Sequence, residues 1–260
     1  MKTKMFTFLI GLLFLGNYSF AKILRVGYTG TPVTGVDYTS LNGAVTDASA
    51  GDTIQVYPDA QNSTPNIDKK LVIMGFGFNL DVHPGLQILN TDQPSYVTIN
   101  LLLGSDGTII SGVTGSVTIG NLSGTGTISN ITIERSYVNF YFNNYNTAPD
   151  IKDIFITSCT VTGVIFNQVP PYSKPVENLQ LNNCILGTGN ISFTDPGTTV
   201  YLTNCVSSYT GFGLTINGAK ALVKNCIFYD SGNGYENSVY ENNFFFNPQP
   251  NPAPSGSNNR

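Results

Sequence analysis

The chain has no tryptophan, a single histidine and few charged residues. Asp, Glu, Lys and Arg make up 11% of the 260 residues, and the formal net charge is −4. With only 12 Lys and Arg and no basic stripe, the composition excludes a nucleic-acid-binding surface that relies on charge. The lone histidine, His83, argues against a zinc site. Abundant Gly, Asn, Thr and Ser instead favour stacked β-structure joined by turns.

The sequence also lacks any apolar run long enough to cross a bilayer. The longest, Met5–Gly16, is well short of the ~20 residues that a membrane-spanning helix needs. Lysines precede it, and the small-x-small sequence Ser19-Phe20-Ala21 follows it. This pattern predicts a secretory signal peptide over residues 1–21, so the mature chain is expected to begin near Lys22 and to be secreted or displayed at a cell surface.

A short phrase recurs along the second half of the chain. Its copies are Ile154–Cys159, Leu179–Cys184, Val200–Cys205 and Ala221–Cys226, with Ile131–Ser136 as a variant and Val239–Asn243 as a degenerate sixth. Apolar residues alternate within each copy, which predicts a strand with one buried face. The four cysteines are 25, 21 and 21 residues apart, and one strand per such interval is typical of a solenoid coil.

A second strand is expected in each coil, after a loop of variable length. The expected segments are Phe140–Asn143, Val164–Asn167, Ile191–Thr194 and Leu214–Asn217. Stacking the coils about 4.8 Å apart places equivalent residues above one another. One interior column would then be aliphatic, with Ile133, Ile156, Leu181, Leu202 and Val223. The other would be mostly aromatic, with Phe142, Phe166, Phe193 and Ile216.

Asparagine precedes three of the four cysteines. Asn183, Asn204 and Asn225, with Ser158 in the same place, should form a hydrogen-bonded ladder at a tight corner, where asparagine tolerates left-handed backbone angles. Arg135 interrupts this column and is expected to point outward. Parallel strands keep neighbouring Cβ vectors parallel, which favours reduced, buried thiols over disulfides among the cysteines.

The segment before the regular coils predicts a cap. Thr39 or Ser40 can begin a short helix with Leu41, Ala44, Val45 and Ala48 on one face, and Gly51 can end it. Such a helix would cover the first edge of the stack. Strands are expected over residues 53–57 and 70–77.

These segments resemble a known family. Ala50–Pro58, followed by Ile67–Gly77, is similar to the opening of right-handed parallel β-helix proteins of the pectin-lyase-like superfamily, and the Asn-Cys phrases resemble its coil repeats. The resemblance spans residues 36–246. It implies a single-stranded right-handed parallel β-helix. It does not imply one activity, because the superfamily includes lyases, hydrolases, epimerases and adhesins.

The predicted organisation is one all-β domain over residues 22–246, in which 36–58 form the cap and first strand. The Pro- and Asn-rich residues 247–260 are expected to form a flexible tail without a strand that could close the last coil.

Enzymes of this superfamily carry acidic residues aligned across adjacent coils, and its lyases hold calcium with them. Here the outward position of the phrases reads Glu134, Thr157, Asn182, Thr203 and Lys224, which supplies one acid in five coils. The densest charge cluster combines Asp150, Lys152 and Asp153 with Glu134 and Arg135. It is either an acid and base group at a sugar-binding loop or a solvated turn, and the solvated turn is favoured. Weaker candidates are Asp195, Asp230 with Glu236, and His83.

Tyrosines give a better functional indication. Tyr137, Tyr141, Tyr145, Tyr172, Tyr201 and Tyr209 lie in or near the coils. Outward rings beside Asn and Thr can stack on sugars, and the same rings can equally pack beneath loops. Asn62, Asn130 and Asn190 begin Asn-x-Ser/Thr triplets.

The sequence therefore favours an exported, non-catalytic β-helix that binds a polysaccharide or cell-surface glycan, or that serves as a surface adhesin. The alternative is a polysaccharide lyase or glycoside hydrolase of the pectin-lyase-like superfamily. No catalytic residue, metal site or cofactor is predicted, and neither nucleic acid nor a membrane span is expected.

Overall fold

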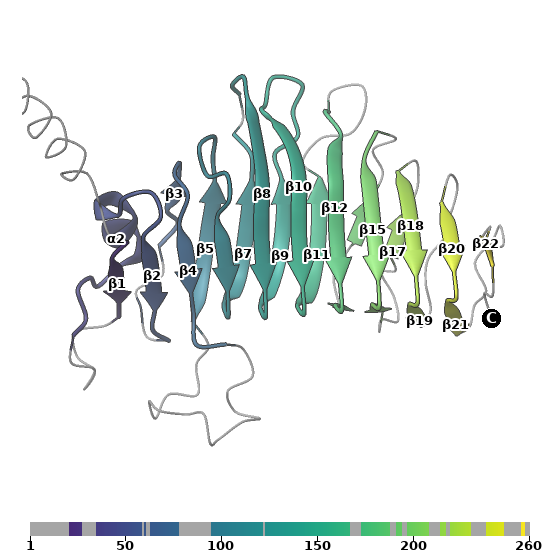
Figure 1. The fold of residues 1–260 in the computed structure, drawn as a ribbon, viewed down its shortest axis with the longest axis horizontal. Helices are drawn as coiled ribbons and strands as arrows, with labels where there is room; N and C mark the ends of the chain where they lie inside the picture. Colours follow the sequence, from purple (N-terminus) through teal and green to yellow (C-terminus); the bar gives the residue numbers. More distant parts are fainter. Residues whose placement is uncertain are drawn as a thin grey trace, which may run out of the picture.

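The protein is a parallel β-helix with a helical cap. A computed structural model describes residues 21–27, 35–58, 60, 63–77, 95–121, 123–166, 173–187, 191–193, 197–207, 214–216, 219–229, 238–246 and 256–257. Two parallel sheets stack their strands along one axis, and Figure 1 shows the cap at one end of the stack. The predicted all-β solenoid is confirmed. Among the described residues, no helix has the length and apolar character needed to cross a membrane.

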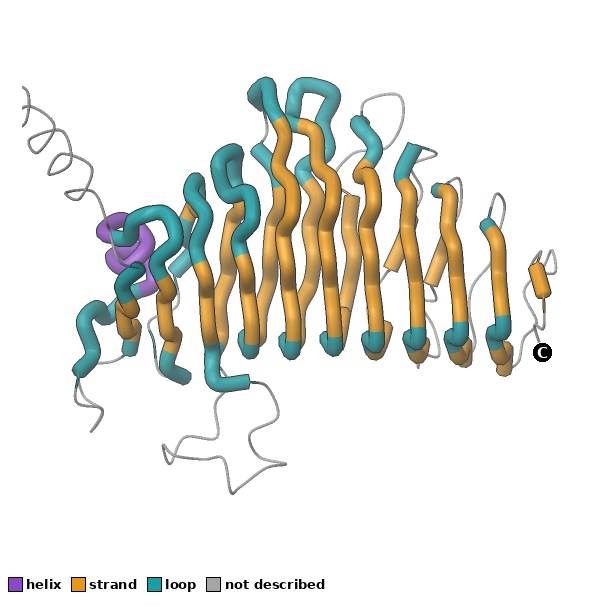
Figure 2. Tube along the Cα trace, viewed as in Figure 1, coloured by secondary structure: helices purple, strands orange, loops and turns teal. Residues whose placement is uncertain are grey.

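Sheet 1 is the near sheet in Figures 1 and 2, and its eleven strands follow chain order. They are β1 (Ile23–Val26), β2 (Thr53–Val56), β4 (Val72–Met74), β6 (Ile109–Ser111), β8 (Thr127–Glu134), β10 (Asp150–Thr157), β12 (Val176–Asn182), β15 (Thr199–Thr203), β18 (Lys220–Lys224), β20 (Val239–Glu241) and β22 (Gly256–Ser257).

Sheet 2 lies behind sheet 1 in the same view, and it too has eleven strands. They are β3 (Asn66–Ile67), β5 (Tyr96–Leu101), β7 (Thr114–Ile119), β9 (Tyr137–Phe142), β11 (Thr160–Phe166), β13 (Ile185–Leu186), β14 (Ile191–Phe193), β16 (Val206–Ser207), β17 (Leu214–Ile216), β19 (Ile227–Tyr229) and β21 (Phe244–Phe246). In Figure 1 sheet 1 runs downward and sheet 2 upward as the chain advances from left to right, so the coil is right-handed.

The interior columns follow from one-to-one register between coils. Each residue of the aliphatic column pairs with its counterpart in the next coil, and each is completely buried. The column is Ile133, Ile156, Leu181, Leu202 and Val223. In the aromatic column the rings of Phe142 and Phe166 stack with centroids 5.1 Å apart. Phe193 and Ile216 are backbone partners further along, as expected, but their side chains lie outside the described residues.

A file of left-handed residues turns the chain from sheet 1 into sheet 2. These residues share φ angles between 49° and 68° and are Gly112, Arg135, Ser158, Asn183, Asn204, Asn225 and Asn242. Asparagine predominates because its short polar side chain tolerates this conformation better than most side chains do. The predicted amide ladder is confirmed at two of its three steps, since Asn225 Nδ2 donates to Asn204 Oδ1 at 3.3 Å and Asn183 Nδ2 donates to Ser158 Oγ at 3.1 Å. At the middle step Asn204 Nδ2 donates to Asn182 Oδ1 at 3.4 Å, one residue before the expected Asn183.

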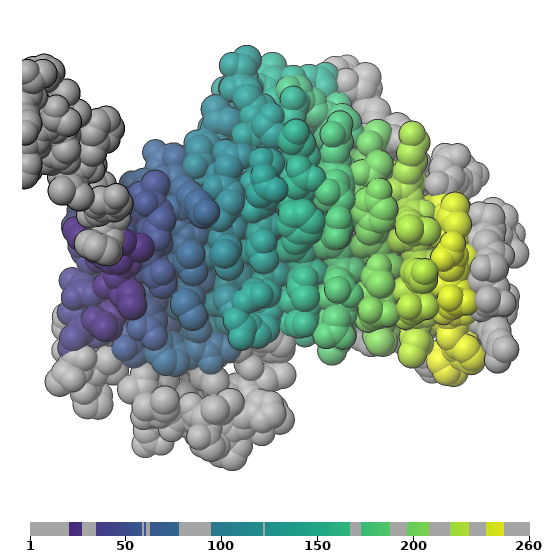
Figure 3. All heavy atoms as spheres, in the orientation of Figure 1, coloured from purple at the N-terminus to yellow at the C-terminus, as the bar shows by residue number. Residues whose placement is uncertain are grey.

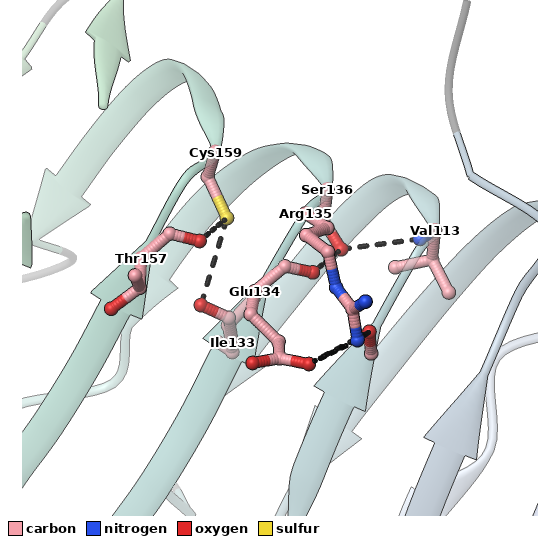
Figure 4. Close-up of polar contacts among 8 residues, drawn as sticks. Val113, Ile133, Glu134, Arg135, Ser136, Thr157 and Cys159 are labelled. Atoms are coloured by element: carbon pink, nitrogen blue, oxygen red, sulfur yellow. Dashed lines mark hydrogen bonds and ion pairs between the residues drawn. The ribbon is translucent and has the colours of Figure 1, made fainter. Parts of the chain in front are cut away.

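After five of these turns, the next residue is a serine or cysteine whose side chain donates a hydrogen bond. Each cysteine Sγ lies 3.3 Å from the carbonyl oxygen two residues earlier, and Ser136 Oγ makes the same contact at 2.8 Å. Figure 4 shows the Ser136 and Cys159 contacts side by side. All four thiols are free and buried, as expected.

The predicted loop between the two strands of a coil is wrong. β9 begins at Tyr137 and β11 at Thr160, directly after Ser136 and Cys159, because one left-handed residue suffices to reverse the chain. The same holds for the short strands β13 and β16, which the sequence patterns did not reveal. The expected second-strand segments nevertheless pair in the expected register, with Phe140 beside Val164 and Val164 beside Ile191.

A second left-handed file, not anticipated from the sequence, bends the longest strands of sheet 1. Asn130, Asp153 and Asn178 have φ angles of 57°, 56° and 55° in consecutive coils. Each interrupts the alternation of buried and outward residues by one position. Asn178 Nδ2 donates to Asp153 Oδ1 at 2.6 Å, which joins two of these corners.

The cap is the helix α2 (Leu41–Asp47), which packs against β1, β2 and β3. Ser40 is its N-cap and accepts from Gly43 N, and Leu41, Ala44 and Val45 are buried, as predicted. The predicted end at Gly51 is wrong, because the helix stops at Ala48 with extended backbone.

Strand β1 lies outside β2 at the edge of sheet 1 and was not predicted. At the other end of the sheet, β22 pairs with β20, so the expectation of a strandless tail is also wrong. Gly256 and Ser257 follow the last proline of the tail, where the backbone regains the N–H groups that strand pairing needs. The rest of residues 247–260 and the predicted signal peptide through residue 20 lie outside the described residues.

Candidate functional site

Charged residues are divided unequally between the two sheets. The strands of sheet 1 contain nine of them: Arg25, Glu134, Asp150, Lys152, Asp153, Glu177, Lys220, Lys224 and Glu241. The eleven strands of sheet 2 contain no Asp, Glu, Lys, Arg or His. Figure 3 shows the outer face of sheet 1. The two faces therefore differ in charge.

One line of outward residues, the outer file, runs along sheet 2 next to the left-handed turns. In register order it consists of Tyr96, Thr114, Tyr137, Thr160, Ile185, Val206, Ile227 and Phe244. Tyr96 is 50% exposed and Tyr137 is 40% exposed. They are separated by two coils, about 9.6 Å at 4.8 Å per coil, with Thr114 between them. The outer file thus presents two accessible tyrosine rings on one line.

Polar side chains lie further along the same face of sheet 2 and are hydrogen-bonded to their neighbours. Thr162 Oγ1 donates to Asn139 Oδ1 at 2.6 Å, and Asn100 Nδ2 donates to Asn66 Oδ1 at 2.9 Å. Tyr141 is half-buried in the row beyond Asn139. Side chains fixed in this way lose little conformational entropy when a ligand binds, which favours affinity.

The second half of the outer file is apolar. Ile185, Val206, Ile227 and Phe244 are between 38% and 49% exposed in four successive coils. Aliphatic side chains at outward strand positions are unusual on a soluble sheet face, and contiguous ones indicate a contact surface. The outer file therefore changes along the helix axis from tyrosine and threonine side chains to aliphatic and phenylalanine side chains, which have no hydroxyl group.

The predicted charge cluster does not come together. Asp150 pairs in register with Thr127, whereas Glu134 pairs with Thr157 at the other end of the same strands. The seven-residue separation corresponds to roughly 23 Å. Asp153 lies between these ends at its left-handed corner.

One half of the cluster borders a pocket of about 270 Å³ at the end of sheet 1 away from the left-handed turns. Its lining residues are Thr127, Asp150, Ile151, Lys152, Lys174, Pro175 and Glu177. Lys174 Nζ lies 2.9 Å from Asp150 Oδ1 and donates to Ala148 O at 2.7 Å. Lys174 and Glu177 were not identified from the sequence, because they lie one coil beyond Asp150 and Lys152 and do not form a local motif with them.

The other half of the cluster lies at the left-handed turns. Arg135 Nη2 is 2.6 Å from Glu134 Oε1 and 3.0 Å from Ser111 Oγ, as Figure 4 shows in part. The Arg135 side chain is 67% exposed, which confirms the expected outward orientation. An exposed ion pair of this kind contributes little stability.

The aligned acids that an enzyme of this architecture needs are sparse. In register, the outward line of sheet 1 reads Glu134, Thr157, Asn182, Thr203, Lys224 and Glu241. Within the described ranges, no group of three or more His, Cys, Asp or Glu side chains is arranged to hold a metal ion. The Cys159 thiol is also a poor nucleophile, since burial raises its pKa to about 11.

The predicted tyrosines lie in different places. Tyr137 and Tyr141 belong to the outer face of sheet 2, Tyr201 is 39% exposed on sheet 1, and Tyr145 forms an isolated bridge with Ser173. Tyr96 was missed, although the alternating residues from Tyr96 to Leu101 are typical of a strand with Tyr, Thr and Asn outward. Tyr172 and Tyr209 lie outside the described residues.

Several other candidates also lie outside the described residues, namely His83, Asp195, Asp230, Glu236, Asn62 and Asn190. Asn130 is described. It is exposed at its left-handed corner, and its Nδ2 donates to Ser129 Oγ at 3.2 Å.

Comparison with known proteins adds no relative. No protein-family model, no curated protein and no solved structure matches the chain.

Proposed function

We propose that this protein is an exported β-helix that binds carbohydrate through the outer face of sheet 2 and does not catalyse a reaction. The observation that carries the proposal is the outer file, with Tyr96 and Tyr137 exposed two coils apart on a sheet whose strands contain no charged residue. Tyrosine combines an apolar ring with a hydroxyl group, and sugars combine apolar C–H faces with hydroxyl groups.

The absence of charge favours a neutral glycan over an acidic one. Carboxylates and sulfates are best recognised by Arg or Lys, which the strands of sheet 2 lack. The net charge of −4 would also oppose an anionic polymer. The outer file runs uncharged through eight coils, so a neutral chain lying along the axis would remain on an uncharged surface from Tyr96 to Phe244.

Membership of the pectin-lyase-like superfamily is part of the proposal. Its support is the segment Ala50–Gly77, the Asn-Cys phrases and the right-handed parallel β-helix itself. Export to the medium or the cell surface is supported by the apolar run Met5–Gly16 and the Ser19-Phe20-Ala21 sequence that follows it. A β-helix displayed at a surface could act as an adhesin through the same face.

A binding screen of the purified protein against neutral and acidic polysaccharides tests the function. Tyr137→Ala should weaken binding to the best neutral glycan by about tenfold or more, because one stacked ring contributes on the order of 1–2 kcal/mol. The matched control is Tyr201→Ala, which removes a similarly exposed ring from sheet 1. Equal losses in the two variants, or binding to no glycan at all, would refute the proposal.

A polysaccharide lyase or hydrolase is the second candidate, and the pocket beside Asp150 favours it. Asp150 and Glu177 supply carboxylates, while Lys152 and Lys174 supply ammonium groups around the same 270 Å³ space. The same screen should follow unsaturated and reducing-end products. Turnover that is lost in Asp150→Ala or Glu177→Ala, but retained in Glu134→Ala, would establish this candidate in place of the first.

A further inference from the structure

Asp52 is a buried carboxylate directly beside the predicted start of the mature chain. Its residue is 2% exposed, at the turn between α2 and β2. Oδ2 accepts from Ser49 N at 2.8 Å, which closes the turn after the helix. Oδ1 accepts from Lys22 N at 2.7 Å, across thirty residues of sequence. The second contact is not needed for the turn and requires its own explanation.

A carboxylate buried to this extent normally has a cationic partner. None of the ion pairs within the described ranges includes Asp52. The nearby Lys69 ammonium donates instead to the carbonyl oxygens of Val45 and Ala48. Burial favours the neutral acid, yet the N–H groups of Lys22 and Ser49, together with the positive charge of Lys22, hold the pKa of Asp52 below its usual value. The site therefore favours an anion and offers a place for one more positive charge.

Lys22 N is the atom that export would make cationic. Lys22 follows Ser19-Phe20-Ala21, the predicted cleavage sequence, and both Ala21 and Lys22 are exposed. Strand β1 begins at the next residue, and Thr53 N donates to Lys22 O at 2.8 Å. The backbone of Lys22 is thus already held in the sheet while the bond before it is accessible.

We propose that cleavage between Ala21 and Lys22 completes a binding site in which the new α-ammonium group of Lys22 pairs with the Asp52 carboxylate. This inference rests on the export that is part of the proposed function. A signal-cleaving protease adds one water molecule across the Ala21–Lys22 peptide bond. Ala21 leaves with the carboxylate, and Lys22 N keeps its electron pair and is protonated to the ammonium.

The consequence is that the edge strand of sheet 1 becomes more stable. A hydrogen bond from a neutral N–H to a carboxylate becomes an ion pair in which donor and acceptor are both charged, which adds Coulomb attraction to the hydrogen bond. Lys22 directly precedes β1, the edge strand of sheet 1. The ion pair between Lys22 and Asp52 therefore stabilises the pairing of a terminal strand, which would otherwise open most easily. Processing would therefore finish the fold of the cap and release the protein in the same step.

The test measures the α-amine of the processed protein. The full chain is expressed in a secreting host, and intact mass and peptide mapping identify the first residue. A folded sample is then labelled near neutral pH with an amine-reactive reagent, and mapping separates the α-amine of Lys22 from lysine side chains. Pairing with a carboxylate raises the pKa of the α-amine and leaves less of the reactive free amine, so labelling should be about tenfold slower than in Asp52→Asn.

Two further variants keep the test decisive. Asp47→Asn, which removes the carboxylate that accepts from the Tyr38 hydroxyl, should leave the labelling rate unchanged. One alanine inserted before Lys22 moves the ammonium away from an intact Asp52 and should restore fast labelling even if Asp52→Asn folds poorly. A mature chain that begins at another residue, or equal labelling rates in the processed protein and the insertion variant, would overturn the inference. A chain that is never cleaved would instead refute export itself.

Discussion

The two sheets share one interior but differ on their outer faces. Inside, both supply completely buried aliphatic and aromatic columns, such as Leu202 from sheet 1 and Phe140 from sheet 2. Outside, the strands of sheet 1 contain nine charged residues, and those of sheet 2 contain none. Because stacking constrains only the inward positions, the outward positions are available for other purposes. The difference supports the proposal that sheet 2 binds a ligand, whereas the charged outer face of sheet 1 suits contact with solvent.

The largest loss of stability should come from substitutions in the interior that the two sheets share. Leu202→Ala removes a completely buried side chain and is expected to lower the free energy of unfolding by about 2–5 kcal/mol. Val206→Ala, in the outer file, should cost far less because Val206 is 38% exposed. Chemical denaturation measures both. Similar losses of unfolding free energy in the two variants would mean that the outer file contributes to stability as much as the interior does. Its residues could then not be regarded as available for binding.

The turn that joins the sheets gives the next largest effect. Asn204 has a φ of 54°, so Asn204→Ala should cost roughly 1–2 kcal/mol, which is the penalty for a Cβ in the left-handed region. Asn204→Gly loses the same ladder contacts, to Asn182 and Asn225, but suits the backbone angle. The alanine variant should therefore unfold at lower denaturant concentration than the glycine variant. The reverse order would contradict the role assigned to this file.

A lysine introduced on one face at a time tests which of the two sheets binds the glycan. Thr114→Lys lies between Tyr96 and Tyr137 in the outer file, and it should weaken binding of a neutral glycan by about tenfold, or roughly 1.4 kcal/mol. Thr203→Lys adds the same charge to sheet 1 and should leave binding unchanged. Titration calorimetry on the two variants checks this. Equal affinities in both would argue against binding on sheet 2.

Acid sensitivity is the smallest expected difference. The strands of sheet 2 have no side chain that titrates below neutral pH, so acid should act on sheet 1 and the cap, with Asp52 as the best-placed group. The folded pKa of Asp52 is lowered, so its contribution is complete well above pH ~4 and is lost as the pH falls through the folded pKa. Asp52→Asn should cost about 1 kcal/mol at neutral pH and progressively less in acid. A loss independent of pH would contradict this.

Periodicity made most of the fold predictable. Alternating apolar residues in the Cys phrases fixed which positions face inward, and the register between coils follows from stacking. The corner at Asp153 was not predictable, because one left-handed residue inside a strand leaves only a single-residue shift in the pattern. Strand β1 was missed for a similar reason, since its four residues form an edge that only the pairing with β2 identifies.

The candidate site was predictable only in part. Tyr137 and Tyr141 were identified from their residue type, but their common face with Tyr96 depends on the register of β5, β7 and β9. The proposed cluster of Asp150 with Glu134 failed because Asp150 begins β10 whereas Glu134 ends the neighbouring strand β8, so the length of a strand separates them. Lys174 and Glu177 meet Asp150 only through coil stacking, which local sequence does not encode.

The left-handed turns lie along one long edge of the β-helix, and this edge should tolerate inserted residues less well than the opposite edge. At the Asn204 edge, one residue reverses the chain and bonds to the coils on either side, so an added residue would disturb three coils at once. The opposite edge carries connections of differing length, and the pocket beside Asp150 lies there. New segments could therefore be grafted at that edge without disturbing the core. Insertions should therefore be poorly tolerated at the edge that carries the Asn204 turn and well tolerated at the edge that carries the Asp150 pocket.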